Sequence, residues 1–161
     1  PDQENLIAGD YSKGNVRIGE LDIAIENPAD SVRFGTDLSG KEWQVKMQHH
    51  YGYIENTMGA DGDEIDVFVK NHLDSDPEHA YIIRQLASDG TFDEHKIVIG
   101  AETEDEAKEI YHSNFEAGWQ GFGSIELIAM ADLPAKFQHT WSEFDSIDSI
   151  VTKENVLDVI D

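Results

Sequence analysis

The stretch YGYIENTMGADGDEIDVFVK, residues 51–70, places Asp61, Asp63 and Asp66 within six positions of one another. Asp66 stands between Ile65 and Val67 in an alternating pattern that is typical of a β-strand. A carboxylate on a covered strand face is costly unless it is paired. Three converging carboxylates would repel one another unless cations lay among them, and Mg²⁺ prefers such hard oxygen ligands. The stretch therefore predicts either a solvated acidic turn or one half of a metal site.

An EF-hand calcium loop is the simplest metal site to test against this pattern. Such a loop needs oxygen ligands at its first, third and fifth positions and glycine at its sixth. Counted from Asp61, the fifth position is Ile65 and the sixth is Asp66. The flanking residues indicate a turn and a strand, where an EF-hand needs helices. The sequence therefore excludes an EF-hand.

Composition narrows the classes of partner. The 161 residues include 11 basic and 34 acidic side chains, for a formal net charge of −23. Affinity for nucleic acid comes mostly from Lys and Arg that neutralise phosphates, so we expect no nucleic-acid partner. No stretch approaches the roughly 20 apolar residues of a membrane span, and we expect no membrane partner. The lack of cysteine excludes disulfides and thiolate metal sites, and it fits a reducing cytoplasm, the expected location.

The rest of the chain predicts one domain of the α+β class. Residues 1–15 are polar and are predicted to form a loosely ordered N-terminal arm, and residues 16–161 a single domain. Alternating apolar residues predict a strand over 16–26, a hairpin with its turn at 37–40, and strands over 65–69, 80–86, 95–99 and 125–130. Together they predict a small, mostly antiparallel sheet curled into a barrel, with one or two packed helices.

Helix signals cluster in the second half of the chain. Thr103 followed by Glu106 is the pattern of a capping box, and it predicts a helix through about residue 115. Shorter helices are predicted near residues 133–137 and 153–160.

The opening stretch resembles the signature of the soluble family I inorganic pyrophosphatases. That signature is D-G-D-x-x-D before an apolar strand, preceded by Y-G-Y-I and a threonine, and here DGDEID, YGYI and Thr57 stand in the matching order. The resemblance implies an OB-like pyrophosphatase fold and hydrolysis of pyrophosphate, or a related phosphoanhydride, with Mg²⁺ or another divalent ion such as Mn²⁺. The chain is also similar to pyrophosphatase-like domains embedded in phage and mobile-element polyproteins, which would account for its beginning at Pro1. Whether it forms a homo-oligomer is left open.

The resemblance implies a divided metal site. Asp63 would accept a proton from the attacking water. Asp93 and Glu94 are alternatives for one ligand position: we prefer Asp93, whereas the ungapped spacing favours Glu94. The implied metal ligands are Asp61, Asp66, Asp89, Asp93, Glu94 and Glu26.

The resemblance also implies a set of phosphate contacts, with two departures from the family pattern. Gly35 stands where the family has a glutamate, and Tyr111, or Phe115 followed by Glu116, lies near its late Tyr-Lys pair without reproducing it. The departures motivate a second hypothesis, a weakened pyrophosphatase-fold domain that serves as a metal- or phosphate-binding module or a phage structural component. A purely structural acidic domain is the third. The residues implied to bind phosphate oxygens are Arg33, Lys46, Tyr51 and Lys96.

Overall fold

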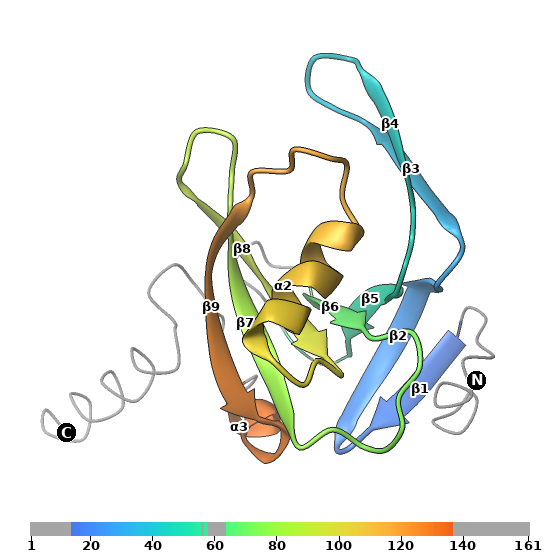
Figure 1. The fold of residues 1–161 in the computed structure, drawn as a ribbon, viewed down its shortest axis with the longest axis vertical. Coiled ribbons are helices and arrows are strands. Elements are labelled where there is room, and N and C mark those ends of the chain that lie inside the picture. The colour runs from blue at the N-terminus through green and yellow to red at the C-terminus, as the bar shows by residue number, and fades with distance from the viewer. Residues whose placement is uncertain (1–13, 56, 58–63, 137–161) are drawn as a thin grey trace, which may run out of the picture.

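The computed structural model describes residues 14–55, 57 and 64–136 (Figure 1). Within these residues the chain forms nine strands and three helical segments. The strands are β1 (Gly14–Ile18), β2 (Leu21–Asn27), β3 (Val32–Thr36), β4 (Glu42–Lys46), β5 (His50–Ile54), β6 (Ile65–Val69), β7 (His79–Leu86), β8 (Phe92–Ile99) and β9 (Phe122–Ala129). The helical segments are α2 (Glu104–Ser113), the 3₁₀ turn η1 (Met130–Asp132) and α3 (Leu133–Lys136). No helix in these ranges has the length and apolar character needed to cross a membrane.

Seven strands form one sheet in the order β1-β2-β5-β6-β8-β7-β9, and β3 pairs with β4 in a separate hairpin that projects from it (Figure 1). All paired strands are antiparallel except β6 and β8, which are parallel. The predicted mostly antiparallel sheet with a packed helix is therefore confirmed. The predicted closure into a barrel is not found among the described residues, where β1 and β9 end the strand order.

Several element boundaries differ from the sequence pattern. The single strand predicted over 16–26 is two antiparallel strands, β1 and β2, because the chain turns at Gly19, whose φ of +60° is one that glycine adopts readily. The helix predicted to run to about residue 115 ends at Ser113, with Asn114 as its C-cap. The predicted helix over 153–160 and residues 1–13 of the predicted arm lie outside the described residues.

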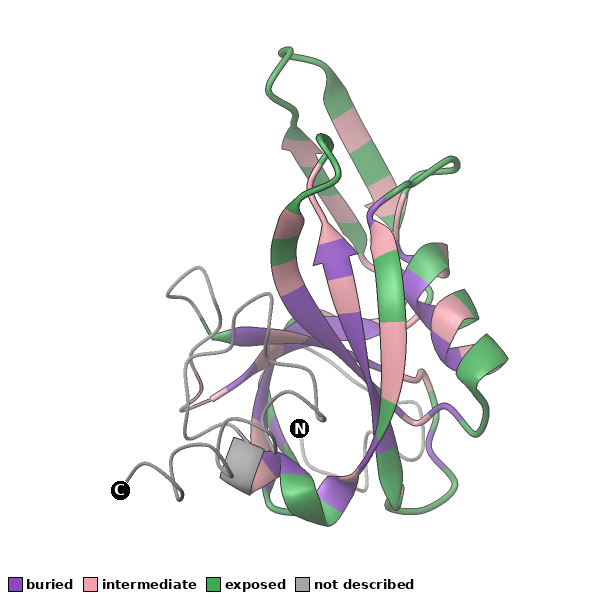
Figure 2. Cartoon of the chain, turned by 90° about the vertical axis from the view of Figure 1, so that its left-hand side faces the viewer, coloured by how far each residue is buried: buried purple, intermediate pink, exposed green. Residues whose placement is uncertain are grey.

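Strand alternation divides the core into two clusters. We call the side of the sheet that carries Ile65, Val67 and Val69 the inner face, and the side that carries Asp66 and Phe68 the outer face. The inner cluster is made of aliphatic residues and methionine from both halves of the sheet. The outer cluster joins the sheet to α2 through Phe68, Val98, Ile110 and Tyr111, among others. Buried positions run along the central strands in Figure 2.

Gly52 allows β2 and β5 to approach closely. A Cβ atom at this position would lie 1.9 Å from the carbonyl oxygen of Ala24. The register of β2 on β5 shifts at a bulge between Ile25 and Asn27. The glycine of the YGYI run is thus required by backbone packing, and its neighbours Tyr51 and Tyr53 project from the outer face, beside Phe68 and Asp66.

Helix α2 begins at the predicted cap. The Thr103 hydroxyl accepts a hydrogen bond from Glu106 N at 3.0 Å, and Glu106 Oε1 accepts one from Glu102 N at 2.6 Å. Lys70, which follows β6, forms an ion pair with Glu106 Oε2 at 2.8 Å. These contacts fix the start of α2 beside the end of β6 and so hold the helix over the outer face.

Candidate active site

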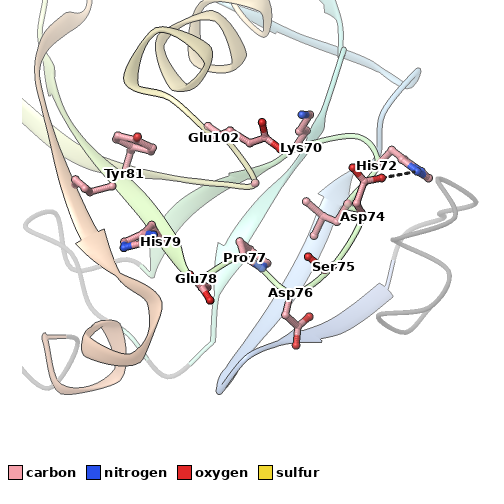
Figure 3. Close-up of a pocket in the computed structure, with 14 residues that line it drawn as sticks. Lys70, His72, Asp74, Ser75, Asp76, Pro77, Glu78, His79, Tyr81 and Glu102 are labelled. Carbon is pink, nitrogen blue, oxygen red and sulfur yellow. Dashed lines mark ion pairs between the residues drawn. The ribbon is translucent and has the colours of Figure 1, made fainter.

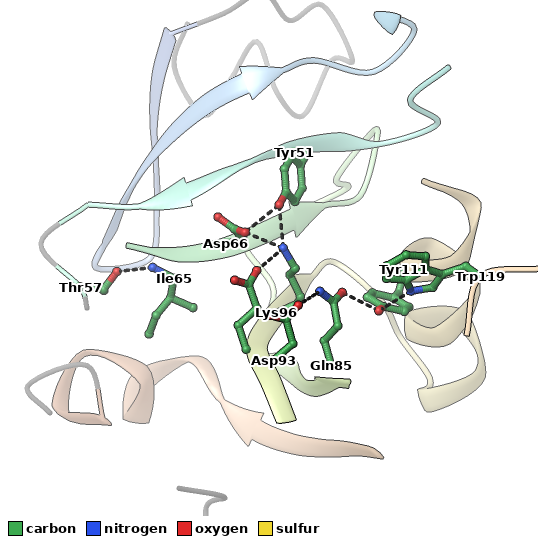
Figure 4. A network of polar contacts seen from close by, with 10 residues as sticks. Tyr51, Thr57, Ile65, Asp66, Gln85, Asp93, Lys96, Tyr111 and Trp119 are labelled. Carbon is green, nitrogen blue, oxygen red and sulfur yellow. Dashed lines mark hydrogen bonds and ion pairs between the residues drawn. The ribbon is translucent and has the colours of Figure 1, made fainter. Parts of the chain in front are cut away.

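Three neighbouring strands bring Tyr51, Asp66 and Lys96 together on the outer face (Figure 4). The register places Asp66 of β6 directly beside Lys96 of β8. The Tyr51 hydroxyl donates to Asp66 Oδ2 at 2.7 Å, and Lys96 Nζ donates to the Tyr51 oxygen at 2.8 Å and to Asp66 Oδ2 at 2.5 Å. Residues 45 positions apart in sequence therefore form one polar cluster.

Glu94 is the second carboxylate of this cluster. Its Oε1 atom lies 2.5 Å from Lys96 Nζ, and the side chains of Lys96, Asp66 and Glu94 are 6%, 27% and 19% exposed. A bulge in β8 leaves Asp93 as an extra residue, because Glu94 pairs with Gln85 and Phe92 with Leu86. Two carboxylates of different strands thus meet at one ammonium group.

The cluster is charged at neutral pH. Burial acts to raise the pKa of Asp66, but the charge of Lys96 and the hydrogen bonds that Lys96 and Tyr51 donate hold that pKa below its usual value. Burial acts to lower the pKa of Lys96, and Tyr51, Asp66 and Glu94 outweigh it, so that this pKa is raised. Burial raises the pKa of Tyr51. The tyrosine therefore remains a neutral hydrogen-bond donor between two ions.

The β3–β4 hairpin adds a second cation. The Arg33 guanidinium carbon lies 4.6 Å from the centroid of the Tyr51 ring and 5.4 Å from that of Trp43. Lys46 pairs with Val32 across the hairpin, one position away from Arg33 on β3, and so lies on the opposite side. Its side chain is 63% exposed, and its ammonium is 4.0 Å from Asp30. The structure brings Arg33 to the cluster and leaves Lys46 apart from it.

Asp93 belongs to a different set of contacts. Its Oδ2 atom accepts a hydrogen bond from Gln85 Nε2 at 3.0 Å, while Gln85 Oε1 accepts one from the Tyr111 hydroxyl at 2.7 Å. The Tyr111 oxygen in turn accepts from Trp119 Nε1 at 2.7 Å (Figure 4). Burial raises the pKa of Tyr111 to about 12. Tyr111 is fully buried and its hydroxyl is engaged on both sides, so it is a structural link between α2 and β7.

Among the contacts of the described residues, neither Asp89 nor Glu26 has a hydrogen bond or ion pair with the cluster, although Glu26 precedes Asn27, which pairs with Tyr51. Asp89 stabilises the turn between β7 and β8, where its Oδ1 atom accepts from Thr91 N at 3.0 Å and from Thr91 Oγ1 at 2.6 Å, and these bonds lower its pKa. Glu26 is exposed at the bulge of β2.

Thr57 lies between β5 and β6. Its Oγ1 atom donates to Ile54 O at 2.6 Å and accepts from Ile65 N at 2.9 Å, which ties the end of β5 to the start of β6. Asp61 and Asp63 lie outside the described residues. Within residues 14–55, 57 and 64–136, no group of three or more His, Asp or Glu side chains is placed to hold a metal ion.

A pocket of about 550 Å³ lies apart from the cluster, between β7 and the loop that follows β6 (Figure 3). Its lining carries Asp74, Asp76, Glu78 and Glu102 against Lys70. Such a lining repels an anion, because the carboxylates outnumber the cation. The cluster at Lys96 is the better match to a phosphate-containing ligand.

Comparison with known proteins identifies the family of the chain. The sequence profile of the family described as Inorganic Pyrophosphatase matches residues 3–138, so the chain belongs to the inorganic pyrophosphatase family. No curated protein matches the chain.

The following two are among the solved structures that match this chain. One is an inorganic pyrophosphatase from Coxiella burnetii, at 14% identity and a TM-score of 0.39, over 72% of this chain and 89% of that one. The other is an inorganic phosphatase from Anaplasma phagocytophilum, at 21% identity and a TM-score of 0.28, over 55% of this chain and 61% of that one.

The sequence did not single out Trp43 as a site residue. A signal was present in the predicted hairpin, because a turn at 37–40 places Trp43 close to Gly35 and Arg33 across the two strands.

Proposed function

We propose that this chain hydrolyses inorganic pyrophosphate to two phosphates with the help of a divalent metal, Mg²⁺ in the first place. The observation that carries the proposal is Lys96, a buried ammonium held between the carboxylates of Asp66 and Glu94 and bonded to Tyr51. Membership of the pyrophosphatase family supports pyrophosphate hydrolysis in general. The arrangement supplies positive charge that can bind phosphate, and it supplies carboxylate oxygens that can bind a metal.

The residues present fit a magnesium ion by their chemistry. Asp66 and Glu94 are hard oxygen donors from different strands that already converge on one positive charge. Together with Asp61 they would hold the ion, and we assign Glu94 rather than Asp93 because Asp93 is bonded to Gln85. When bound, such an ion lowers the pKa of a coordinated water and neutralises phosphate charge. Mn²⁺ has the same preference for carboxylates and would be the natural substitute.

The chain's own residues bind the substrate and stabilise its charge. Lys96 and Arg33 would contact phosphate oxygens, and the neutral Tyr51 hydroxyl, which donates to Asp66 and accepts from Lys96, would hold these two groups in place. Asp63 would take the proton of the attacking water. Lys46, Asp89 and Glu26 enter the proposal as outer groups, with Asp89 and Glu26 supporting further ions. The cytoplasmic location, assembly with further copies and the polyprotein context stay predictions of the sequence.

A second candidate function is a weakened pyrophosphatase domain that binds metal or phosphate without rapid turnover. The buried Tyr111 favours it, because its hydroxyl is bonded to Gln85 and Trp119 and cannot also bind a substrate phosphate. Gly35, which replaces a family glutamate, points the same way.

Phosphate release from pyrophosphate, measured colorimetrically with and without Mg²⁺, separates these candidates. We expect metal-dependent release by the wild type and a loss of roughly 100-fold or more in Asp66→Asn and in Asp63→Asn. Asp76→Asn, at an exposed position in the separate pocket, is the matched control and should retain the wild-type rate. A wild type without metal-dependent release would refute the enzymatic proposal, and magnesium binding in calorimetry would then identify the binding module.

A further inference from the structure

The Arg33 guanidinium is held by aromatic rings from two different parts of the chain. Trp43 comes from the neighbouring strand of the hairpin, and Tyr51 comes from the main sheet. A guanidinium within about 6 Å of a ring centroid is attracted by the negative face of the ring. Arg33 is therefore attracted by the ring of Trp43, which belongs to the same hairpin, and by the ring of Tyr51, which belongs to the active-site cluster.

Gly35 makes room for the indole of Trp43. These two residues are paired directly across β3 and β4. A Cβ atom at position 35 would lie 2.6 Å from Trp43 Cζ2 and 3.0 Å from Cε2, inside any acceptable contact. The indole thus covers the backbone of Gly35, and a side chain at position 35 would displace it. The departure from the family pattern at position 35 is therefore coupled to the tryptophan at position 43.

The Arg33 side chain needs contacts that hold it in place, because its hairpin lies outside the seven-stranded sheet. At its base, Asp30 N and Met47 N donate to Met47 O and Ser31 O at 2.7 and 2.8 Å. Arg33 projects from this arm on a long side chain that loses considerable rotamer freedom when it is ordered. A groove of about 780 Å³ beside Gly35 and Trp43 leaves this side of the hairpin open.

We propose that Trp43 is a positioning residue that holds Arg33 over Tyr51, where the guanidinium contacts a phosphate group of the substrate, and that Gly35 is required for this role. The inference rests on the proposed function and specifies how this chain binds the phosphate group. Trp43 acts through Arg33 and touches no reacting atom.

Steady-state kinetics with magnesium pyrophosphate provides the first test. In Trp43→Ala we expect KM to rise about tenfold with a smaller change in kcat, because a group that binds substrate and transition state alike is no longer held in place. Trp43→Phe should restore most of the affinity, since a phenyl ring also attracts a guanidinium. Leu38→Ala, a truncation of a fully exposed side chain at the tip of the same hairpin, should leave KM unchanged. Equal KM values for Trp43→Ala and the wild type would overturn the inference.

A double-mutant cycle tests the coupling of Gly35 to Trp43. Gly35→Ala alone should raise KM as Trp43→Ala does, because the new Cβ displaces the indole. In a Trp43→Ala background the same change should add nothing, since the displaced group is already absent. Additive effects would show that the two positions act independently and would overturn the proposed unit.

Binding of methylenediphosphonate, an analogue that cannot be hydrolysed, separates this inference from the proposed function. Calorimetry should show about tenfold weaker binding to Trp43→Ala than to the wild type and to Leu38→Ala. A wild type that binds the analogue with this dependence but releases no phosphate would refute turnover and support the role of Trp43. If the wild type releases phosphate and Trp43→Ala binds the analogue as the wild type does, the proposed function is supported and the role of Trp43 is refuted. A wild type that fails to bind the analogue would overturn the inference.

Discussion

The two faces of the sheet differ most sharply at two adjacent residues of β8. Ile97 is fully buried in the inner cluster of aliphatic side chains. Lys96 is 5% exposed on the outer face and forms its contacts with Asp66, Glu94 and Tyr51. One strand therefore contributes apolar burial to one side and a desolvated charge to the other. The inner face stabilises the fold, and the outer face holds charges that only mutual pairing makes tolerable.

Two buried titratable groups, His50 on the inner face and Lys96 on the outer face, differ in their charge at neutral pH. His50 pairs in register with Val69 of the inner face, and it is 1% exposed. Burial, followed by the neighbouring His49, lowers its pKa to about 4 against the opposing effect of Asp30, so it is neutral at pH 7. Lys96 has a raised pKa and is charged at the same pH. At these two buried positions, the inner face holds a neutral imidazole and the outer face holds a paired ammonium.

Lys96→Met should have the largest effect. Removal of the ammonium leaves Asp66 and Glu94 close together without their cation, which we expect to cost about 3 kcal/mol of unfolding free energy. Pyrophosphate hydrolysis should fall roughly 100- to 1000-fold. Urea denaturation and phosphate release measure the two effects.

The pH dependence of the same variant has a definite sign. The pKa of Asp66 is lowered in the folded protein, so its pairing contributes stability above 3.8 and loses it as the pH falls through the lowered value. The stability difference between wild type and Lys96→Met should therefore be present at pH 7 and shrink below about pH 3.8. Lys70→Met is the control, because its pair with Glu106 is about one-third exposed and should cost less than about 1 kcal/mol.

Ile97→Ala should separate stability from activity. Truncation of a buried isoleucine costs roughly 2–5 kcal/mol, through lost burial and the cavity that remains. The outer cluster supplies the charge stabilisation, and Ile97 lies on the inner face. The rate of pyrophosphate hydrolysis per folded molecule should therefore stay within about twofold of the wild-type rate. Leu127→Ala, at a half-exposed position, should change stability far less. A large loss of rate at full folding would show that the faces are not independent.

The alternation of Ile65, Val67 and Val69 predicted that Asp66 would face the other side of its strand, and the structure has it there. Periodicity could not say that Asp66 meets Lys96, because it carries no information on which distant strands pair. The family resemblance assigned Asp66 to the metal and Lys96 to phosphate, and it predicted no contact between them. The cap of α2 was predictable because Thr103 and Glu106 interact within one turn.

The sequence does not predict the position of a side chain where a bulge or the strand register determines it. A bulge at Asp93 gives Glu94 the place beside Asp66 and sends Asp93 to Gln85, so the preference for Asp93 does not match its contacts. The family resemblance grouped Lys46 with Arg33 as phosphate contacts, yet the hairpin register puts the two side chains on opposite sides. Neither the bulge nor this register follows from residue type alone.

His50→Asn should sharpen the contrast between neutral and charged burial. The pKa of His50 is lowered in the fold, so its contribution to stability is present above pH 6.5 and is lost as the pH falls towards 4. The wild type should lose about 2 kcal/mol relative to His50→Asn over this range, after allowance for screening by water. The Asn side-chain oxygen can still accept from Ala29 N, as Nδ1 of His50 does at 3.1 Å. Parallel pH profiles of thermal stability for the wild type and His50→Asn would contradict the lowered pKa of His50. His79→Asn, at an exposed position, is the control.

Thr103→Ala should give the smallest effect and test how the outer face is covered. The substitution removes the acceptor for Glu106 N, and loss of such a cap costs about 1 kcal/mol. Thr103→Ser keeps the oxygen and should behave as the wild type. Helix α2 packs on the outer cluster through Ala107, Ile110 and Tyr111, so a loosened helix should show faster hydrogen exchange in α2. Exchange in β1, whose Val16 and Ile18 pack in the inner cluster, should stay unchanged. Equal increases in both places would mean that the two clusters unfold as one unit.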